Sequence, residues 1–127
     1  MAQLQMAQLQ SAILDNARLE FASLGGADFY DATLVDANLA KANLDGANLE
    51  GVHAYHADLR DANLTDVSLV GANISDANLS DAVLFGADLS ATVLDRVVFR
   101  GAVSDERTRW PQDFDWRAAG VELTDAG

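Results

Sequence analysis

The sequence of 127 residues contains no cysteine, one proline and two histidines. Without cysteine there is no disulfide framework and no thiol chemistry, which is compatible with a reducing compartment. Eight Lys and Arg residues stand against twenty Asp and Glu, so the formal net charge is −12. Nucleic-acid binding requires Lys and Arg to displace counterions. We therefore expect no direct contact with nucleic acid.

Long hydrophobic runs are also missing. The segment Met1–Gln10 has neither a positively charged side chain nor a continuous apolar run. It therefore predicts neither a signal peptide nor a membrane span. We expect a cytoplasmic location and no contact with a membrane.

Groups that carry out catalysis are scarce and scattered. The sequence has no Gly-rich phosphate loop, and its histidines are His53 and His56 alone. Catalysis by a nucleophile needs a base within reach and a third group to orient it. Asp36 and Asp76 would flank His56 on an exterior face, but exposed ligands on a flat face lack the supporting contacts of a metal centre. We expect no enzyme activity, no cofactor and no metal site.

The sequence has a strict period of five residues. From Leu4 to Phe99, Leu occupies sixteen of the twenty positions at this spacing, and Ala occupies sixteen of the twenty positions two residues earlier. Such a period determines architecture before local propensity does. An α-helix would spread these leucines around its surface, because five steps of roughly 100° place each about 140° from the last. A straight strand would place successive leucines on opposite faces.

The leucines can share one side only if the chain turns a corner in every pentad. Four right-angled corners close a square coil of about twenty residues, and stacked coils would pair as parallel strands about 4.8 Å apart. Ala and Leu would then fill the interior. The sequence predicts an all-β solenoid, a rod of about 24 Å if five coils stack at that spacing.

The pentads also resemble a known family. The runs ANLAK (37–41), ANLDG (42–46), ANLTD (62–66) and ANLSD (77–81) are similar to those of pentapeptide repeat proteins, and the resemblance covers about residues 2–103. It implies a right-handed quadrilateral parallel β-helix of about five four-pentad coils, with no general catalytic site. We expect this β-helix at residues 1–103 and a C-terminal capping tail at 104–127. The segment TRWPQDFDWRAAGV (108–121) resembles a tail of cyanobacterial members.

Charge is distributed unevenly over the four expected faces. One face consists of the pentads centred on Leu9, Phe29, Leu49, Leu69 and Leu89. In these pentads the charged residues are all acidic: Asp28, Asp31, Glu50 and Asp88. We call this side the acidic face. It predicts a non-catalytic scaffold that presents an acidic surface to a protein partner.

Two other functions stay open. Some members of the family that the chain resembles protect DNA gyrase by presenting a duplex-like charged rod, so a DNA-mimicking modulator of type II topoisomerase is one alternative. Its weakness is charge: duplex DNA about 24 Å long carries roughly 14 charges, whereas the solenoid part has a net charge of −9. The second alternative is a structural unit that assembles end to end.

The last coil departs from the pattern. Val83, Val93 and Val98 stand where Asn or Asp is usual, and the tail supplies Trp110, Phe114 and Trp116. These residues predict that something covers this coil end, because solenoid ends expose unpaired strand edges. The tail either folds back as a cap, which we favour, or joins a symmetric partner; a homodimer through a coil end is compatible with both. At the other end, the repeated MAQLQ predicts either a frayed half-coil or a short capping helix.

Overall fold

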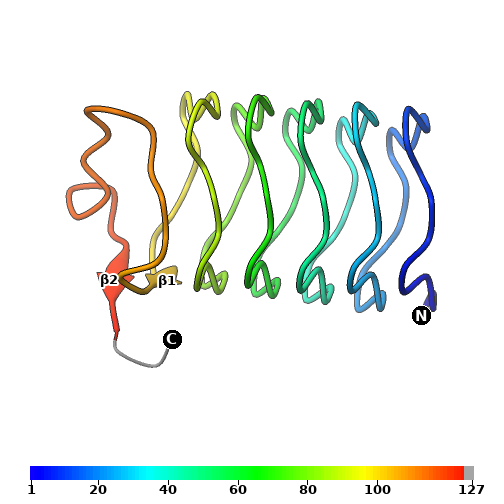
Figure 1. Ribbon diagram of the computed structural model, residues 1–127, viewed down its shortest axis with the longest axis horizontal. Helices are drawn as coiled ribbons and strands as arrows, with labels where there is room; N and C mark the ends of the chain where they lie inside the picture. The colour runs from blue at the N-terminus through cyan, green and yellow to red at the C-terminus, as the bar shows by residue number, and fades with distance from the viewer. Residues whose placement is uncertain (125–127) are drawn as a thin grey trace.

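The computed structural model describes residues 1–124 and shows coils stacked along one axis, with the tail at the end opposite to the N-terminus (Figure 1). Isolated parallel bridges join residues twenty apart, from Gln3↔Ser23 to Val83↔Val103. The predicted fold class, a right-handed quadrilateral parallel β-helix, is confirmed. Residues 125–127 of the expected tail lie outside the described residues.

Extended strands are short throughout. β1 (Val103–Ser104) and β2 (Glu122–Leu123) pair in parallel near the C-terminus, and the coils are held by single bridges. Residues 1–124 contain no helix, and so none that could cross a membrane. Gln3 and Gln8 form bridges to the second coil, so the N-terminal segment is a regular first coil rather than a helical cap.

Each corner is a hydrogen-bonded β-turn. In the first pentad the Ala7 N–H donates to the Leu4 carbonyl at 3.0 Å, and Met6 between them has a φ of 60°. A positive φ at the third turn residue is the feature of a type II turn. Asp and Asn tolerate this conformation better than most residues. The corner residues Asp31, Asp36, Asp61, Asp66, Asp76 and Asp81 all adopt it.

The core consists of stacked layers of Ala and Leu. Leu24, Leu44, Leu64 and Leu84 lie twenty residues apart on one side of the coil, and each is fully buried. At the N-terminal end, where no further coil covers the core among the described residues, Leu4 is only partly buried. Burial of the central residues therefore depends on a coil above and a coil below.

The outward residue before each central one has a local structural function. The Asn38 Oδ1 atom accepts a hydrogen bond from the Ala40 N–H at 3.0 Å, and Asn63 accepts one from the Thr65 N–H at 3.1 Å. Short side chains with an acceptor satisfy the backbone in this way. Asn and Asp are therefore frequent here for folding reasons, and acidity alone does not identify a functional face.

The tail folds back over the last coil. Its register shifts by one residue, because Arg109 forms a bridge to Asp88, twenty-one positions earlier. The Trp110 and Phe114 rings then pack on Phe99, with ring centroids 5.5 and 5.7 Å away. Trp116 stacks on Trp110 at 6.3 Å. These aromatic side chains cover the end of the core.

The tail does not cover all the valines that were expected beneath it. Val93 and Val98 remain 40% and 44% exposed, and Val83 is half-buried beside Val103. The reason is geometric: each valine directly precedes an inward central residue, so its side chain points away from the core. The tail covers the inward Phe99 instead.

Candidate functional site

The coil register brings the predicted acidic residues onto one side of the rod. Parallel bridges link Asp28 to Asn48, Asn48 to Ser68, and Ser68 to Asp88. Asp28 and Asp88 are therefore three coil spacings apart, about 14 Å at the usual strand separation. Glu50 and Asp31 come from pentads on the same side.

Neutral donors hold the Asp28 carboxylate in place. Its Oδ1 atom accepts hydrogen bonds from the Tyr30 N–H at 3.0 Å and the Asn48 side chain at 3.2 Å. Its Oδ2 atom accepts one from the Gln10 side chain at 2.9 Å. The carboxylate is oriented without losing its net charge.

Glu50 and Asp88 are held similarly. The Ser68 hydroxyl donates to Glu50 Oε2 at 3.0 Å, and the Ser90 N–H donates to Asp88 Oδ1 at 3.0 Å. The Ser90 hydroxyl also donates to Asp88 Oδ1, at 2.6 Å. Hydroxyl and amide donors fix the directions of these carboxylates before any partner binds.

The Asp31 carboxylate occupies space that a glycine in the next coil leaves free. Asp31 is an exposed corner residue with a φ of 57°, and Gly51 occupies the equivalent corner with a φ of 69°. A Cβ at Gly51 would collide with the Asp31 carboxylate. Glycine therefore leaves room for this carboxylate and also adopts the left-handed backbone at little cost.

Two arginines on other faces are paired with carboxylates of their own faces. Arg60 forms an ion pair with Asp58 at 2.7 Å, and its hydrogen bond is the main cause that lowers the pKa of Asp58. Arg96 pairs with Asp76 at 2.7 Å and lowers the pKa of that carboxyl in the same way.

Only one ion pair reaches the acidic face within residues 1–124. Arg109 approaches Asp88 at 4.0 Å. The prediction that the face lacks basic residues concerned its five pentads, and Arg109 comes from the tail. The sequence analysis missed this contact because it assumed a constant spacing of twenty residues. One extra residue between Ser104 and Arg109 shifts the register and places Arg109 beside Asp88.

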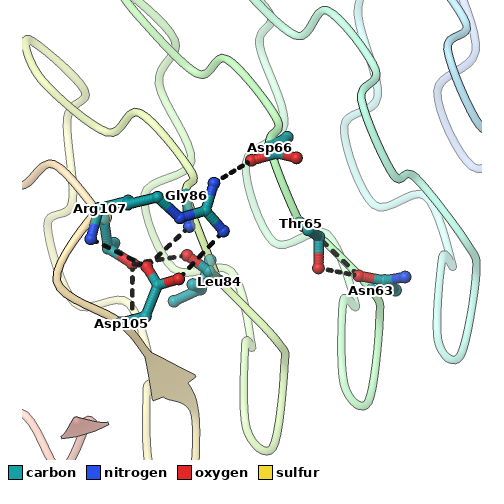
Figure 2. A network of polar contacts seen from close by, with 8 residues as sticks. Asn63, Thr65, Asp66, Leu84, Gly86, Asp105 and Arg107 are labelled. Atoms are coloured by element: carbon teal, nitrogen blue, oxygen red, sulfur yellow. Dashed lines mark hydrogen bonds and ion pairs between the residues drawn. The ribbon is translucent and has the colours of Figure 1, made fainter. Parts of the chain in front are cut away.

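A second polar cluster that the sequence analysis missed attaches the tail (Figure 2). Asp105 is 4% exposed, and its Oδ1 atom accepts hydrogen bonds from the Gly86 N–H at 3.0 Å and the Arg107 N–H at 3.1 Å. The Arg107 guanidinium bridges Asp105 at 3.1 Å and Asp66 at 3.0 Å. One sequence feature could have indicated this cluster: Ser104 is a polar residue at a central position that Leu usually occupies.

Asp36, His56 and Asp76 are not brought together into a metal-binding group among the described residues. No group of acidic or histidine side chains within residues 1–124 has the arrangement needed to hold a metal ion. Asp76, one of the two carboxylates expected to flank His56, is bound by Arg96 through two hydrogen bonds of 2.7 and 3.0 Å.

Comparison with known proteins gives a consistent family match. The family model described as pentapeptide repeats matches residues 2–39, 12–51 and 42–81, with eight copies. The comparison with curated proteins found no match.

Several solved structures are similar. The pentapeptide repeat protein Rfr23 from the cyanobacterium Cyanothece 51142 is 34% identical, with a TM-score of 0.73 over 73% of this chain and 63% of that chain. HetL from the cyanobacterium Nostoc sp. strain PCC 7120, a pentapeptide repeat protein involved in heterocyst differentiation regulation, is 23% identical, with a TM-score of 0.68 over 95% of this chain and 61% of that chain. The chain thus spans less than two thirds of the length of either, and the likeness to HetL shows the fold alone.

A structure of QnrB1, a plasmid-mediated fluoroquinolone resistance protein, is 20% identical. Its TM-score is 0.44 over 93% of this chain and 65% of that chain. This likeness supports no statement about the function of the present chain.

Proposed function

This chain belongs to the pentapeptide repeat family, and on that premise we propose that it is a non-catalytic binding protein whose acidic face docks a protein with a basic surface. Pentapeptide repeat proteins are generally structural or binding proteins. A rigid β-helix suits this use because its outward side chains are held at fixed spacings by backbone pairing.

One observation carries the proposal: the charge of the acidic face is left largely uncompensated. Asp28, Asp31 and Glu50 have no cationic partner within residues 1–124, and their pentads contain no basic residue. The faces of Asp58 and Asp76 also hold unpaired carboxylates, but each carries arginine, and Arg60 and Arg96 neutralise these two residues. An oriented, unpaired set of carboxylates attracts Lys and Arg side chains and raises the rate of encounter with a basic surface.

The experiment compares two neutralised variants with the wild type in affinity capture from an extract of the source organism. The first variant removes four charges from the acidic face: Asp28→Asn, Asp31→Asn, Glu50→Gln and Asp88→Asn. Asn and Gln keep the acceptors for the Tyr30, Ser68 and Ser90 donors, so the local fold is expected to survive.

The matched control removes four charges from other faces: Asp36→Asn, Asp45→Asn, Asp61→Asn and Asp81→Asn. Both variants change net charge equally, so only position differs. We expect a protein that wild type and control retain and that the acidic-face variant loses by tenfold or more. Equal retention by both variants, or equal loss from both, would refute the proposal.

The topoisomerase alternative requires a higher charge density. Asp28 and Asp88 span about 14 Å, a length of duplex that carries about eight phosphates, and the acidic face supplies four carboxylates there. We therefore expect no inhibition of gyrase supercoiling, with or without a fluoroquinolone, at tens of micromolar protein. Inhibition or protection at micromolar levels or below would favour the DNA-mimic function.

A further inference from the structure

The tail leaves the strand edge at residues 92–96 of the last complete coil unpaired. One coil earlier, the Ile74 N–H donates to the Val93 carbonyl at 3.2 Å, and the Asp76 N–H donates to the Asp95 carbonyl at 2.9 Å. The equivalent donors twenty residues on are the Leu94 and Arg96 N–H groups. Neither has a hydrogen-bond partner within residues 1–124, nor has the Thr92 carbonyl.

The tail avoids this edge because of its own sequence. It still pairs with the preceding side of the coil, where the Arg109 N–H donates to the Ala87 carbonyl at 2.9 Å. Pro111 then removes one backbone donor and cannot continue a ladder. A turn follows, in which the Phe114 N–H donates to the Pro111 carbonyl at 3.1 Å and Asp113 has a φ of 67°. The chain is diverted before it reaches Leu94.

The diversion leaves an open groove of about 520 Å³ between the coil edge and the tail. Thr92, Val93, Leu94 and Asp95 line one side, and residues 111–114 line the other. Its apolar surface comes from Val93, Leu94, Pro111 and Phe114. The charged lining residues are Asp95 and Asp113, so the groove combines apolar side chains with negative charge.

We propose that this groove binds an extended peptide segment as an added parallel strand, with an apolar side chain over Leu94 and basic side chains beside Asp95 and Asp113. Strand addition to an open edge obtains affinity from main-chain hydrogen bonds and specificity from pockets for alternate side chains. The unpaired donors of Leu94 and Arg96, with the Thr92 acceptor, reproduce the pattern through which each coil binds the next. This surface is separate from the acidic face.

The negative charge of the groove favours a basic peptide segment as the occupant. The Arg96 guanidinium is already bound by Asp76 through bonds of 2.7 and 3.0 Å, and no cation lines the groove. A second copy of this chain carries a net charge of −12 and would approach this acidic edge against electrostatic repulsion. A basic peptide meets no such repulsion.

The test uses a defined probe: an N-acetylated, C-amidated peptide of sequence Lys-Ala-Asn-Leu-Lys, which places the pentad pattern between two lysines. Amide NMR spectra of the full chain are recorded during titration, together with amide hydrogen exchange. In the free protein, Leu94 and Arg96 are expected to exchange much faster than Ile74 and Asp76. On titration, shifts are expected at residues 92–96 and 111–114, with slower exchange at Leu94 and Arg96.

Two matched variants make the test specific. Val93→Lys places a positive charge in the groove, whereas Val98→Lys places the same charge at an equally exposed outward position on the neighbouring face. We expect Val93→Lys to weaken peptide binding at least tenfold and Val98→Lys less than twofold, and a probe with Glu in place of Lys to bind at least tenfold more weakly.

Three results would overturn the proposal. One is the absence of shifts at millimolar peptide. Another is binding that survives Val93→Lys unchanged. The third is protection of the Leu94 and Arg96 amides that grows with protein concentration in the absence of peptide, which would identify a second copy of the chain as the occupant.

Discussion

Replacing Asp105 by Ala is expected to lower the free energy of unfolding by about 1–3 kcal/mol, the usual cost of leaving a donor without its hydrogen-bond partner. The carboxylate is 4% exposed and accepts hydrogen bonds from Gly86, Arg107 and Thr108. Its loss leaves the Gly86 N–H without a partner and frees the start of the tail. Urea denaturation followed by tryptophan fluorescence measures the effect. Both tryptophans of the chain lie in the tail, so their emission reports its docking directly.

Asp45→Ala is the matched control. Asp45 is exposed, and its side chain makes no hydrogen bond within residues 1–124, so we expect a change below about 0.5 kcal/mol. An Asp105→Ala protein with the stability and tryptophan emission of the wild type would show that the Asp105 cluster does not hold the tail.

The Asp105 carboxylate is also expected to make the stability of the protein depend on pH. Burial by itself raises the pKa of Asp105, but the hydrogen bonds from Gly86 and Thr108 and the charge of Arg107 outweigh it, so the pKa lies below its usual value. Its contribution to stability is therefore complete above the unfolded-state pKa of about 3.9 and is lost as pH falls through the lower folded-state value. Below about pH 4, wild-type stability should fall more steeply than that of Asp105→Asn. Equal slopes would contradict this account.

Leu64→Ala is expected to lower the free energy of unfolding by about 3–5 kcal/mol. Leu64 is fully buried between Leu44 and Leu84, which are equally buried. Its backbone N–H donates to the Val83 carbonyl at 2.8 Å, so the coil cannot easily move inward to fill the cavity. The measurement is urea unfolding followed by circular dichroism.

Leu4→Ala provides the comparison for this second prediction. Leu4 is the equivalent core residue of the first coil, at the N-terminal end, and it is only partly buried. We expect no more than half the loss seen for Leu64→Ala. Equal losses at the two positions would mean that burial between coils does not determine the stability of the core.

The period of five predicted the solenoid because it left the chain one way to bury its leucines. Parallel bridges at a spacing of twenty residues confirm the register over the five coils. The tail was harder to predict, since its contacts follow no repeat. The shift that aligns Arg109 with Asp88 depends on the turn held by Asp105, and a buried aspartate in a surface-like sequence gives no periodic signal.

The candidate site was predictable in position but not in electrostatic detail. The period places Asp28, Glu50 and Asp88 on one side, as the bridges show. Whether a carboxylate is neutralised depends on side-chain geometry: Arg60 turns back to Asp58 in its own pentad, whereas Arg107 reaches Asp66 across forty-one positions. The exposure of Val93 and Val98 was also not predictable from the period. An apolar residue at an outward position stays exposed unless another segment covers it.

Carboxyl footprinting would test the central claim most directly. The wild-type chain is modified with a carbodiimide and a neutral amine in the presence and absence of an extract of the source organism, and each modified carboxyl is quantified by mass spectrometry. The account predicts that the extract protects Asp28, Asp31 and Glu50, while the exposed Asp36, Asp45 and Asp61 react as before. Equal reactivity of the two sets with and without extract, or protection of the second set alone, would contradict the claim that the acidic face is the docking surface.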